Sequence, residues 1–214
     1  MDASLIAIIF PIVVLIISAV IHEVAHGYAA DYLDDPTPRN AGRLTFNPLS
    51  HLDPVGSVLL PLILVVTNSP FLFAFARPVP YTPAYLRWRT YGEAFVAFAG
   101  PGSNILLALV TAGLLHAASV FGVLSPTILA LGYLVVFINV LLALFNLLPL
   151  PSFDGLKVIR PFLPKALQRG VDRVEQLAQQ HFVLMLLATL FVFTSVLGSQ
   201  FFAVIAWTTE ILVP

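Results

Sequence analysis

Residues 3–26 read ASLIAIIFPIVVLIISAVIHEVAH, an apolar run that ends in two histidines and a glutamate. Ala3–Ile21 is long enough to cross a bilayer as one helix. Residues four apart share a face of a helix, so His22 and His26 would present both imidazoles to the same metal ion. Glu23 lies beside them, where its carboxylate can take a proton from water. The stretch therefore predicts a Zn²⁺ site at the end of a membrane span.

An alternative is a pair of histidines that simply satisfy each other and the backbone near a helix end. Ionisable groups at the centre of a membrane helix cost about 2.5–3.5 kcal/mol each, so they seldom lie there without a function. The chain contains no cysteine, which excludes disulfides and thiolate metal sites. Any metal must then be held by histidine and carboxylate, and we expect one Zn²⁺ per chain.

The composition is that of an integral membrane protein. Hydrophobic residues make up 59% of the chain and charged residues only 10%. The formal net charge of −1 gives no argument for a nucleic-acid partner. No Lys or Arg precedes the first apolar run, so the pattern is not that of a cleavable signal peptide. We expect a single membrane-embedded domain over residues 1–214, in a multi-pass protein of the cell membrane; the oligomeric state is left open.

Uncharged runs locate the other spans. Pro54–Ala76 is apolar but is interrupted by proline and glycine. Ala94–Phe153 contains no Asp, Glu, Lys or Arg and is long enough for two spans, with a turn near Gly122–Pro126. Phe182–Thr209 is a further uncharged run, which crosses once or folds into a hairpin at Gly198. The fold expected is an all-α polytopic membrane protein with about four to six transmembrane helices around the zinc site.

Two shorter stretches predict structure outside the spans. Between Leu163 and Leu177, apolar residues recur at steps of three or four among Arg, Gln and Asp, which predicts an amphipathic helix on the membrane surface. Gly42–Phe46 alternates polar and apolar residues. This pattern predicts a short edge strand that could pair with an unwound peptide, and an ordinary surface loop is the alternative.

A second motif, NLLPLPSFDG, covers Asn146–Gly155. Pro149 and Pro151 cannot continue a helix, so the chain should unwind just before Asp154. Irregular backbone near membrane depth is tolerated only against protein or a wet cavity. Asp154 is therefore a candidate for the third zinc ligand, with Gly155 allowing a tight turn. The alternative is an ordinary loop that ends a helix at the membrane surface.

Three motifs together resemble those of the site-2 protease family of intramembrane zinc metalloproteases. They are HEVAH at His22–His26, AGPGSN at Ala99–Asn104, and the NxxPxPxxDG stretch at Asn146–Gly155. The stretches Asn47–Pro54 and Ala76–Pro80 resemble a compact prokaryotic branch that lacks PDZ and other accessory domains. The resemblance extends over nearly the whole chain.

The resemblance implies a zinc metalloendopeptidase that hydrolyses peptide bonds within, or at the cytoplasmic edge of, transmembrane segments of membrane protein substrates. The matching positions make His22, His26 and Asp154 the zinc ligands. They make Glu23 the catalytic base and place Asn146 close to the site, where it could help to stabilise the oxyanion.

Other interpretations are weighed beside this one. A membrane metal-ion transporter or metal sensor would also use intramembrane His and Asp, but it should show further polar residues across the bilayer. A non-catalytic scaffold would normally have lost Glu23. His51 and Asp53 could shape the site or contact zinc, and a polar loop cap is an equally good interpretation of both.

Topology follows from the requirement that His22 and Asp154 share one ion. An even number of crossings must separate them, and Ala94–Phe153 already supplies two. Pro54–Ala76 should then be a re-entrant hairpin, broken near Asn68-Ser69-Pro70. With the hairpin, all ten Lys and Arg residues fall on the active-site side. The positive-inside rule makes that side cytoplasmic and places the N-terminus outside.

Overall fold

The computed structural model describes residues 3–59, 62–63, 66, 76–181, 185, 188, 191 and 198–214. These residues form helices, turns and irregular segments, with no strand among them. Three of the helices are long and apolar enough to cross a membrane, at Leu5–Tyr32, Gly92–Val120 and Pro126–Asn146. The predicted class, an all-helical polytopic membrane protein, is confirmed. Spans beyond these three would involve Pro54–Ala76 and Phe182–Thr209, parts of which lie outside the described residues.

The first span, α1 (Ala3–Tyr32), has an exposed half and a buried half. Ile8, Ile12 and Ile17 are exposed, as suits side chains that face lipid. From Ser18 onward the buried positions include polar groups. A backbone in lipid must satisfy its own hydrogen bonds, which keeps this β-branched sequence helical despite its modest helix propensity. The N-terminal half of α1 therefore suits contact with lipid, and the C-terminal half supplies buried polar side chains.

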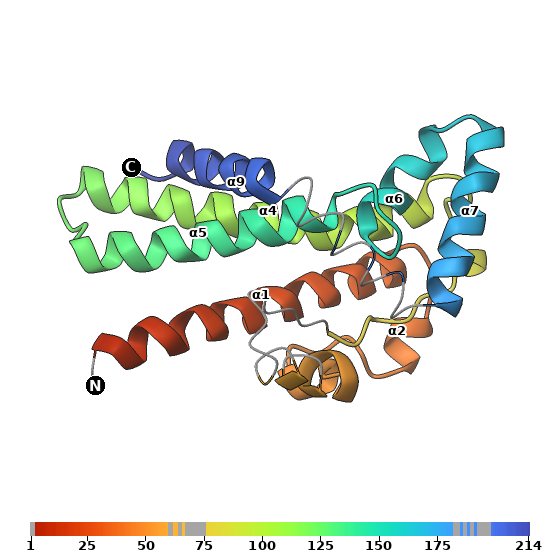
Figure 1. The fold of residues 1–214 in the computed structure, drawn as a ribbon, viewed down its shortest axis with the longest axis horizontal. Coiled ribbons are helices and arrows are strands. Elements are labelled where there is room, and N and C mark those ends of the chain that lie inside the picture. Colours follow the sequence, from red (N-terminus) through yellow and green to blue (C-terminus); the bar gives the residue numbers. More distant parts are fainter. Residues whose placement is uncertain are drawn as a thin grey trace.

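The next two spans form an antiparallel hairpin, visible in Figure 1 as the pair α4 (Gly92–Val120) and α5 (Pro126–Asn146). Gly122 lies between them with φ +69°, a left-handed conformation that glycine adopts without strain. The Ser125 side chain then accepts a hydrogen bond from the Ile128 N–H at 3.2 Å and caps α5. The predicted turn is confirmed.

A further helix, α9 (Gly198–Leu212), packs against this hairpin. The core between the three helices consists of Ala108, Ala112, Val136, Val140 and Ile205. Small residues on α4 let α5 approach closely. The His116 ring lies 3.1 Å from the Leu212 carbonyl, so α9 ends at the same end of the bundle as the α4–α5 turn.

The opposite end of the bundle gathers the C-terminus of α1, the start of α4 and the end of α5 (Figure 1). Short helices cover it: α2 (Thr37–Asn40), η1 (Pro48–His51), η2 (Pro54–Leu59), η3 (Pro83–Tyr85), α6 (Asp154–Ile159) and η4 (Arg160–Phe162). The predicted amphipathic helix is also present here as α7 (Lys165–Gln180), which runs crosswise to the spans in Figure 1. Leu167 and Leu177 on its apolar face are exposed, as a helix lying on a membrane surface requires.

The predicted edge strand at Gly42–Phe46 is wrong, because this stretch is irregular. Its backbone and side chains are used in other contacts. The Thr45 carbonyl pairs with the His51 ring at 2.8 Å, and the buried Arg43 guanidinium donates to the carbonyl of Arg77. One carbonyl of the stretch, that of Thr45, is therefore paired with a side chain, as in an ordinary loop.

The stretch Pro54–Ala76 begins and ends on one side of the molecule. The Arg77 N–H donates to the His51 carbonyl at 2.8 Å, and the Arg87 N–H donates to the Leu33 carbonyl at 2.9 Å. Both flanks therefore lie at the end of the bundle where α1 stops, as the re-entrant hairpin requires. The predicted break at residues 68–70 falls outside the described residues and stays a prediction.

Candidate metal centre

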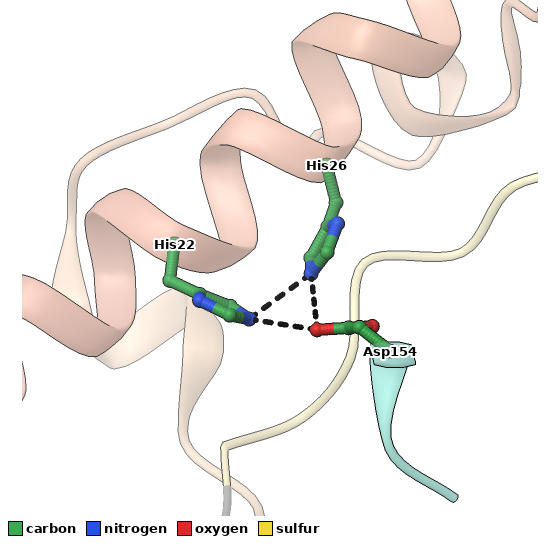
Figure 2. A group of neighbouring side chains, drawn as sticks. All are labelled: His22, His26 and Asp154. Atoms are coloured by element: carbon green, nitrogen blue, oxygen red, sulfur yellow. Dashed lines mark hydrogen bonds and ion pairs between the residues drawn. The ribbon is translucent and has the colours of Figure 1, made fainter. Parts of the chain in front are cut away.

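The histidines of the first motif lie one turn apart on the buried half of α1, and both side chains point toward α4 and α6. His22 and His26 are both at least nine-tenths buried. Asp154 begins α6, and its side chain is 17% exposed. Figure 2 shows the three side chains converging from these two elements. The structure thus brings together the three residues predicted as ligands, although Asp154 lies far along the chain from the two histidines.

The unwinding predicted before Asp154 is confirmed, but its details differ. The left-handed residue is Ser152, with φ +70°, and not Gly155. Gly155 is needed for a different reason: a Cβ there would overlap the Leu147 carbonyl. The glycine therefore lets the start of α6 pack directly on the backbone that ends α5, and this close contact carries Asp154 back toward α1.

The three ligand atoms form a nearly equilateral triangle. His26 Nε2 lies 3.1 Å from His22 Nε2, and Asp154 Oδ2 lies 3.2 Å from His22 Nε2 and 3.3 Å from His26 Nε2. Tetrahedral Zn²⁺ with bonds of about 2.0–2.1 Å separates its ligand atoms by about 3.3–3.4 Å. The triangle therefore has the size of one face of a zinc tetrahedron, which leaves the fourth position for a water or substrate.

The hydrogen bonds of the two rings turn their lone pairs toward this centre. His26 Nδ1 lies 2.7 Å from the Val96 carbonyl, and His22 Nδ1 lies 2.7 Å from Asn104 Oδ1. Donation from Nδ1 to these acceptors leaves a lone pair on Nε2 of each ring, which is the arrangement in which both rings can bind a metal ion. Together with Asp154 Oδ2 they place three acceptors within van der Waals contact. Such an arrangement is unfavourable unless a cation lies between them, so the donor set fits Zn²⁺.

The charge state of Asp154 agrees with a ligand role. Burial raises the pKa of its carboxyl, but hydrogen bonds and positive charge from the two imidazoles, present when Nε2 carries a proton in place of a metal ion, lower that pKa by more, so the net pKa lies below the ordinary value. The group is therefore ionised at neutral pH, as metal binding requires.

Gly100 leaves the space that such an ion needs. A Cβ at this position of α4 would overlap His26 Nε2 and lie 2.6 Å from His22 Nε2. Glycine costs helix stability, so its presence at the closest approach of α4 to α1 has a steric reason. Any side chain here would fill the centre.

Glu23 is held by a backbone donor from a distant segment. Its Oε2 accepts a hydrogen bond from the Val79 N–H at 2.9 Å. Val79 belongs to an irregular run, Arg77–Pro80, that we call the proline segment. Proline has no N–H, so Val79 offers the one backbone donor between Pro78 and Pro80. One carboxylate oxygen of Glu23 is thereby fixed.

The proline segment is itself fastened by Arg43. The buried guanidinium donates through Nη2 to the carbonyls of Arg77 and Pro78, the latter at 3.3 Å. Val79 packs on the other face, where its Cγ1 lies 3.1 Å from the position that a Cβ on Gly27 would take. The proline segment therefore lies between Arg43 and α1, and it contacts α1 at Glu23 and beside Gly27.

Three other residues singled out from the sequence lie outside the triangle. Asn146 donates to the Leu142 carbonyl at 2.9 Å, within its own helix. His51 is buried and pairs with the Thr45 carbonyl, and the Asp53 side chain accepts from the Gly56 N–H at 2.8 Å. These contacts favour the loop-cap interpretation of His51 and Asp53.

Several residues around the triangle were not predicted, namely Val79, Val96, Gly100, Asn104 and Asn139. For Asn139, a signal existed, since a polar side chain in an uncharged membrane run usually has a function. Asn104 ends the AGPGSN motif that carried the resemblance. The contributions of Val79 and Val96 come from backbone atoms, for which side-chain identity gives no signal.

Comparison with known proteins places this architecture in a family. The pattern of Peptidase family M50 matches residues 123–189, which include Asp154. "Putative zinc metalloprotease YwhC" of Bacillus subtilis is 35% identical over 77% of this chain and 74% of its own length. "Putative zinc metalloprotease Rip2" of Mycolicibacterium smegmatis is 29% identical over 90% of this chain and 70% of its own length. No solved structure matches the chain. By these relationships and its shared motifs, the chain belongs to peptidase family M50, the site-2 protease family of zinc metalloproteases.

Proposed function

We propose that this protein is an intramembrane zinc metalloendopeptidase. It would hydrolyse peptide bonds within, or at the cytoplasmic edge of, membrane-spanning segments of other proteins. The observation that carries the proposal is the triangle of His22, His26 and Asp154 ligand atoms beside Glu23, built on a helix that is itself long enough to span the membrane. Membership of the M50 family supports a peptidase, and the location of the triangle supports membrane substrates.

His22, His26 and Asp154 would hold one Zn²⁺ through Nε2, Nε2 and Oδ2. Bound there, Zn²⁺ acts as a Lewis acid and allows water to serve as a nucleophile near neutral pH. The chain contributes the remaining steps through its own side chains. Glu23 takes the proton of the attacking water on Oε1, because Oε2 is occupied by the Val79 N–H. It then returns that proton to the leaving amine of the peptide.

Asn146 is proposed as a second catalytic group that stabilises the developing oxyanion. Its amide has two N–H groups, and one of them donates to the Leu142 carbonyl. The other is the group that would meet the substrate. Loss of a single oxyanion donor slows peptide hydrolysis by about 100- to 1,000-fold. We expect Asn146→Leu to fall in this range without loss of zinc.

The substrate must unwind before it can be cleaved. A helix keeps its carbonyls in i→i−4 hydrogen bonds, so attack requires at least one turn to open. Substrates whose spans contain glycine, proline or polar residues should therefore be preferred. A lipid bilayer and membrane-spanning polypeptides are the partners expected, and no nucleic acid.

We propose that the site opens toward the cytoplasm and that the N-terminus lies outside. All ten Lys and Arg residues lie either between α1 and α4 or after α5. These positions lie at the end of the bundle that carries Glu23, and not at the α4–α5 turn. The positive-inside rule then assigns that end to the cytoplasm.

A transporter or metal sensor is not favoured, because the relatives are named as metalloproteases. The decisive experiment uses the purified full chain with Zn²⁺ and a panel of single-span peptides in detergent or bilayers, with products identified by mass spectrometry. We expect cleavage within or near the span, and none by Glu23→Gln, which keeps the shape of the side chain but cannot act as a base. Zinc content should be the same in both proteins. Cleavage by Glu23→Gln at a rate near that of the unchanged protein would refute the general-base assignment.

A further inference from the structure

Two asparagines lie fully inside the bundle, and neither is a proposed ligand. Asn104 on α4 is 0% exposed and Asn139 on α5 is 1% exposed. Both lie in membrane-spanning helices, where a buried amide is costly unless its donors and acceptors are paired. Amides are therefore retained at these depths only where their hydrogen bonds are used.

The two amides form a chain of hydrogen bonds that crosses three helices. Asn139 Nδ2 donates to the Val135 carbonyl at 2.9 Å. Asn104 Nδ2 donates to Asn139 Oδ1 at 3.0 Å. Asn104 Oδ1 then faces His22 Nδ1 at 2.7 Å. The chain starts on a backbone carbonyl of α5 and ends on a proposed zinc ligand of α1.

The two histidines differ in the group that determines which ring nitrogen carries the proton. His26 Nδ1 faces the Val96 carbonyl, which can only accept, so this ring must carry its proton on Nδ1. His22 faces an amide, and a primary amide can present either its oxygen or its NH₂ group. If Asn104 turned its NH₂ toward His22, the ring proton would move to Nε2. That proton would block the atom that has to bind Zn²⁺.

The far end of the chain decides which way Asn104 points. The Val135 carbonyl can only accept, so Asn139 must turn its NH₂ toward it and its oxygen toward Asn104. Asn104 must then turn its own NH₂ toward Asn139, which leaves its oxygen for His22. The Ser18 carbonyl, 3.4 Å from Asn104 Nδ2, favours the same orientation. It lies beyond the usual hydrogen-bond range, so the Asn139 contact dominates.

We propose that Asn104 and Asn139 are positioning residues that hold His22 in the tautomer with its proton on Nδ1. They keep Nε2 free for Zn²⁺ and orient the ring, and Asn139 acts without touching any ligand. This inference rests on the proposed zinc site. Partners of metal-bound histidines typically change metal affinity by about 10- to 100-fold when removed.

The test compares zinc affinity in variants of the full chain, measured by competition with a chelating dye. Asn139→Leu removes the group that orients Asn104, and we expect zinc affinity to fall by about 10- to 100-fold. Asn139→Asp is the matched control. A neutral aspartic acid in this buried position can still donate to the Val135 carbonyl and accept from Asn104. Its zinc affinity should stay close to that of the unchanged protein.

A second readout reports the Nδ1 proton of His22 directly. The Zn²⁺-loaded chain, labelled with ¹⁵N-histidine, is examined by NMR, because without a metal ion Asp154 and the neighbouring ring would themselves draw a proton to Nε2. We expect a slowly exchanging proton on Nδ1 of His22 in the unchanged protein. In Asn139→Leu this proton should exchange faster, because Asn104 can then turn its oxygen away. His26 is an internal reference, because the Val96 carbonyl fixes it in every variant.

The proposal is overturned if Nδ1 of His22 in the unchanged protein carries no slowly exchanging proton. It is also overturned if Asn139→Leu binds zinc as tightly as the unchanged protein. If Asn139→Leu does not fold, the NMR result on the unchanged protein still decides. Absence of zinc binding by the unchanged protein would instead refute the proposed function, so the two failures are distinguishable.

Discussion

At the scale of single residues, the site depends on a glycine that leaves room for a metal ion as much as on the side chains that could bind the ion. The imidazoles and the carboxylate converge to within 3.1–3.3 Å, and Gly100 faces them without a side chain. The three groups could therefore hold a metal ion between them, and the glycine lets α4 approach without filling that space.

Substitution of Gly100 by Ala should remove zinc binding and peptidase activity together, because the added methyl group overlaps His26 Nε2. Gly113→Ala, on the same helix, is the control, since nothing lies within 4 Å of its Cβ position. It should leave zinc content unchanged and stabilise the helix by up to about 1 kcal/mol. Zinc content by mass spectrometry and thermal unfolding check both. Full zinc occupancy in Gly100→Ala would show that the ion does not lie where the triangle places it.

Substitution of His22, His26 or Asp154 by Ala should lower zinc content as well as activity. Removing one of three protein ligands leaves a site that cannot complete a tetrahedron. Each variant is checked by zinc content after dialysis, with Glu23→Gln as the control that retains the metal. Asp154→Ala with full zinc occupancy at high affinity would point to another ligand, such as His51 or Asp53.

At the scale of elements, the proline segment joins the loops to the catalytic helix. Arg43 holds the carbonyls of Arg77 and Pro78, and the next N–H along the chain holds Glu23. A change at Arg43 should therefore reach Glu23 through the backbone and leave the zinc ligands in place.

Arg43→Met should slow cleavage by up to about 100-fold, the loss expected when a catalytic group shifts by about 1 Å. Zinc affinity should not change. Arg39→Met is the control, because Arg39 is exposed and pairs only with Asp31 at 2.6 Å in the described contacts. Steady-state cleavage rates and zinc affinities are measured for both variants. Loss of zinc in Arg43→Met alone would mean that the segment supports the ligands and not the base.

At the scale of the whole molecule, the elements that carry basic residues, among them α2, α6 and α7, lie at the end of the bundle where α1 stops (Figure 1). The flanks of Pro54–Ala76 also meet there, through the hydrogen bond from Arg77 to His51. Both observations agree with a chain that enters the membrane after residue 54 and returns on the same side.

Single cysteines in this cysteine-free chain test the topology. Ser50→Cys and Thr82→Cys should react with a membrane-impermeant reagent from the same side, and Val123→Cys, in the α4–α5 turn, from the opposite side. Right-side-out and inverted vesicles distinguish the two faces. Labelling of Ser50→Cys and Thr82→Cys from opposite sides would contradict both the hairpin and a shared metal ion.

The local part of this architecture could be predicted from the sequence. Helical periodicity alone places His22 and His26 on one face, and the two prolines predict that the helix before Asp154 ends, as α5 does at Asn146. Contacts between distant segments could not be predicted in this way. The Val79 N–H contacts Glu23 from a segment that Arg43 also holds, and neither contact has a local sequence signal. The alternating pattern at Gly42–Phe46 predicted a strand, and the structure has an irregular segment there.

The central claim is that peptide hydrolysis by this chain requires a metal ion held by His22, His26 and Asp154. The most direct test measures cleavage of a single-span substrate by the purified chain before and after metal removal with 1,10-phenanthroline, with metal content verified. The account predicts that cleavage stops when the metal is removed and returns when Zn²⁺ is added back. Cleavage that persists after verified metal removal would contradict it.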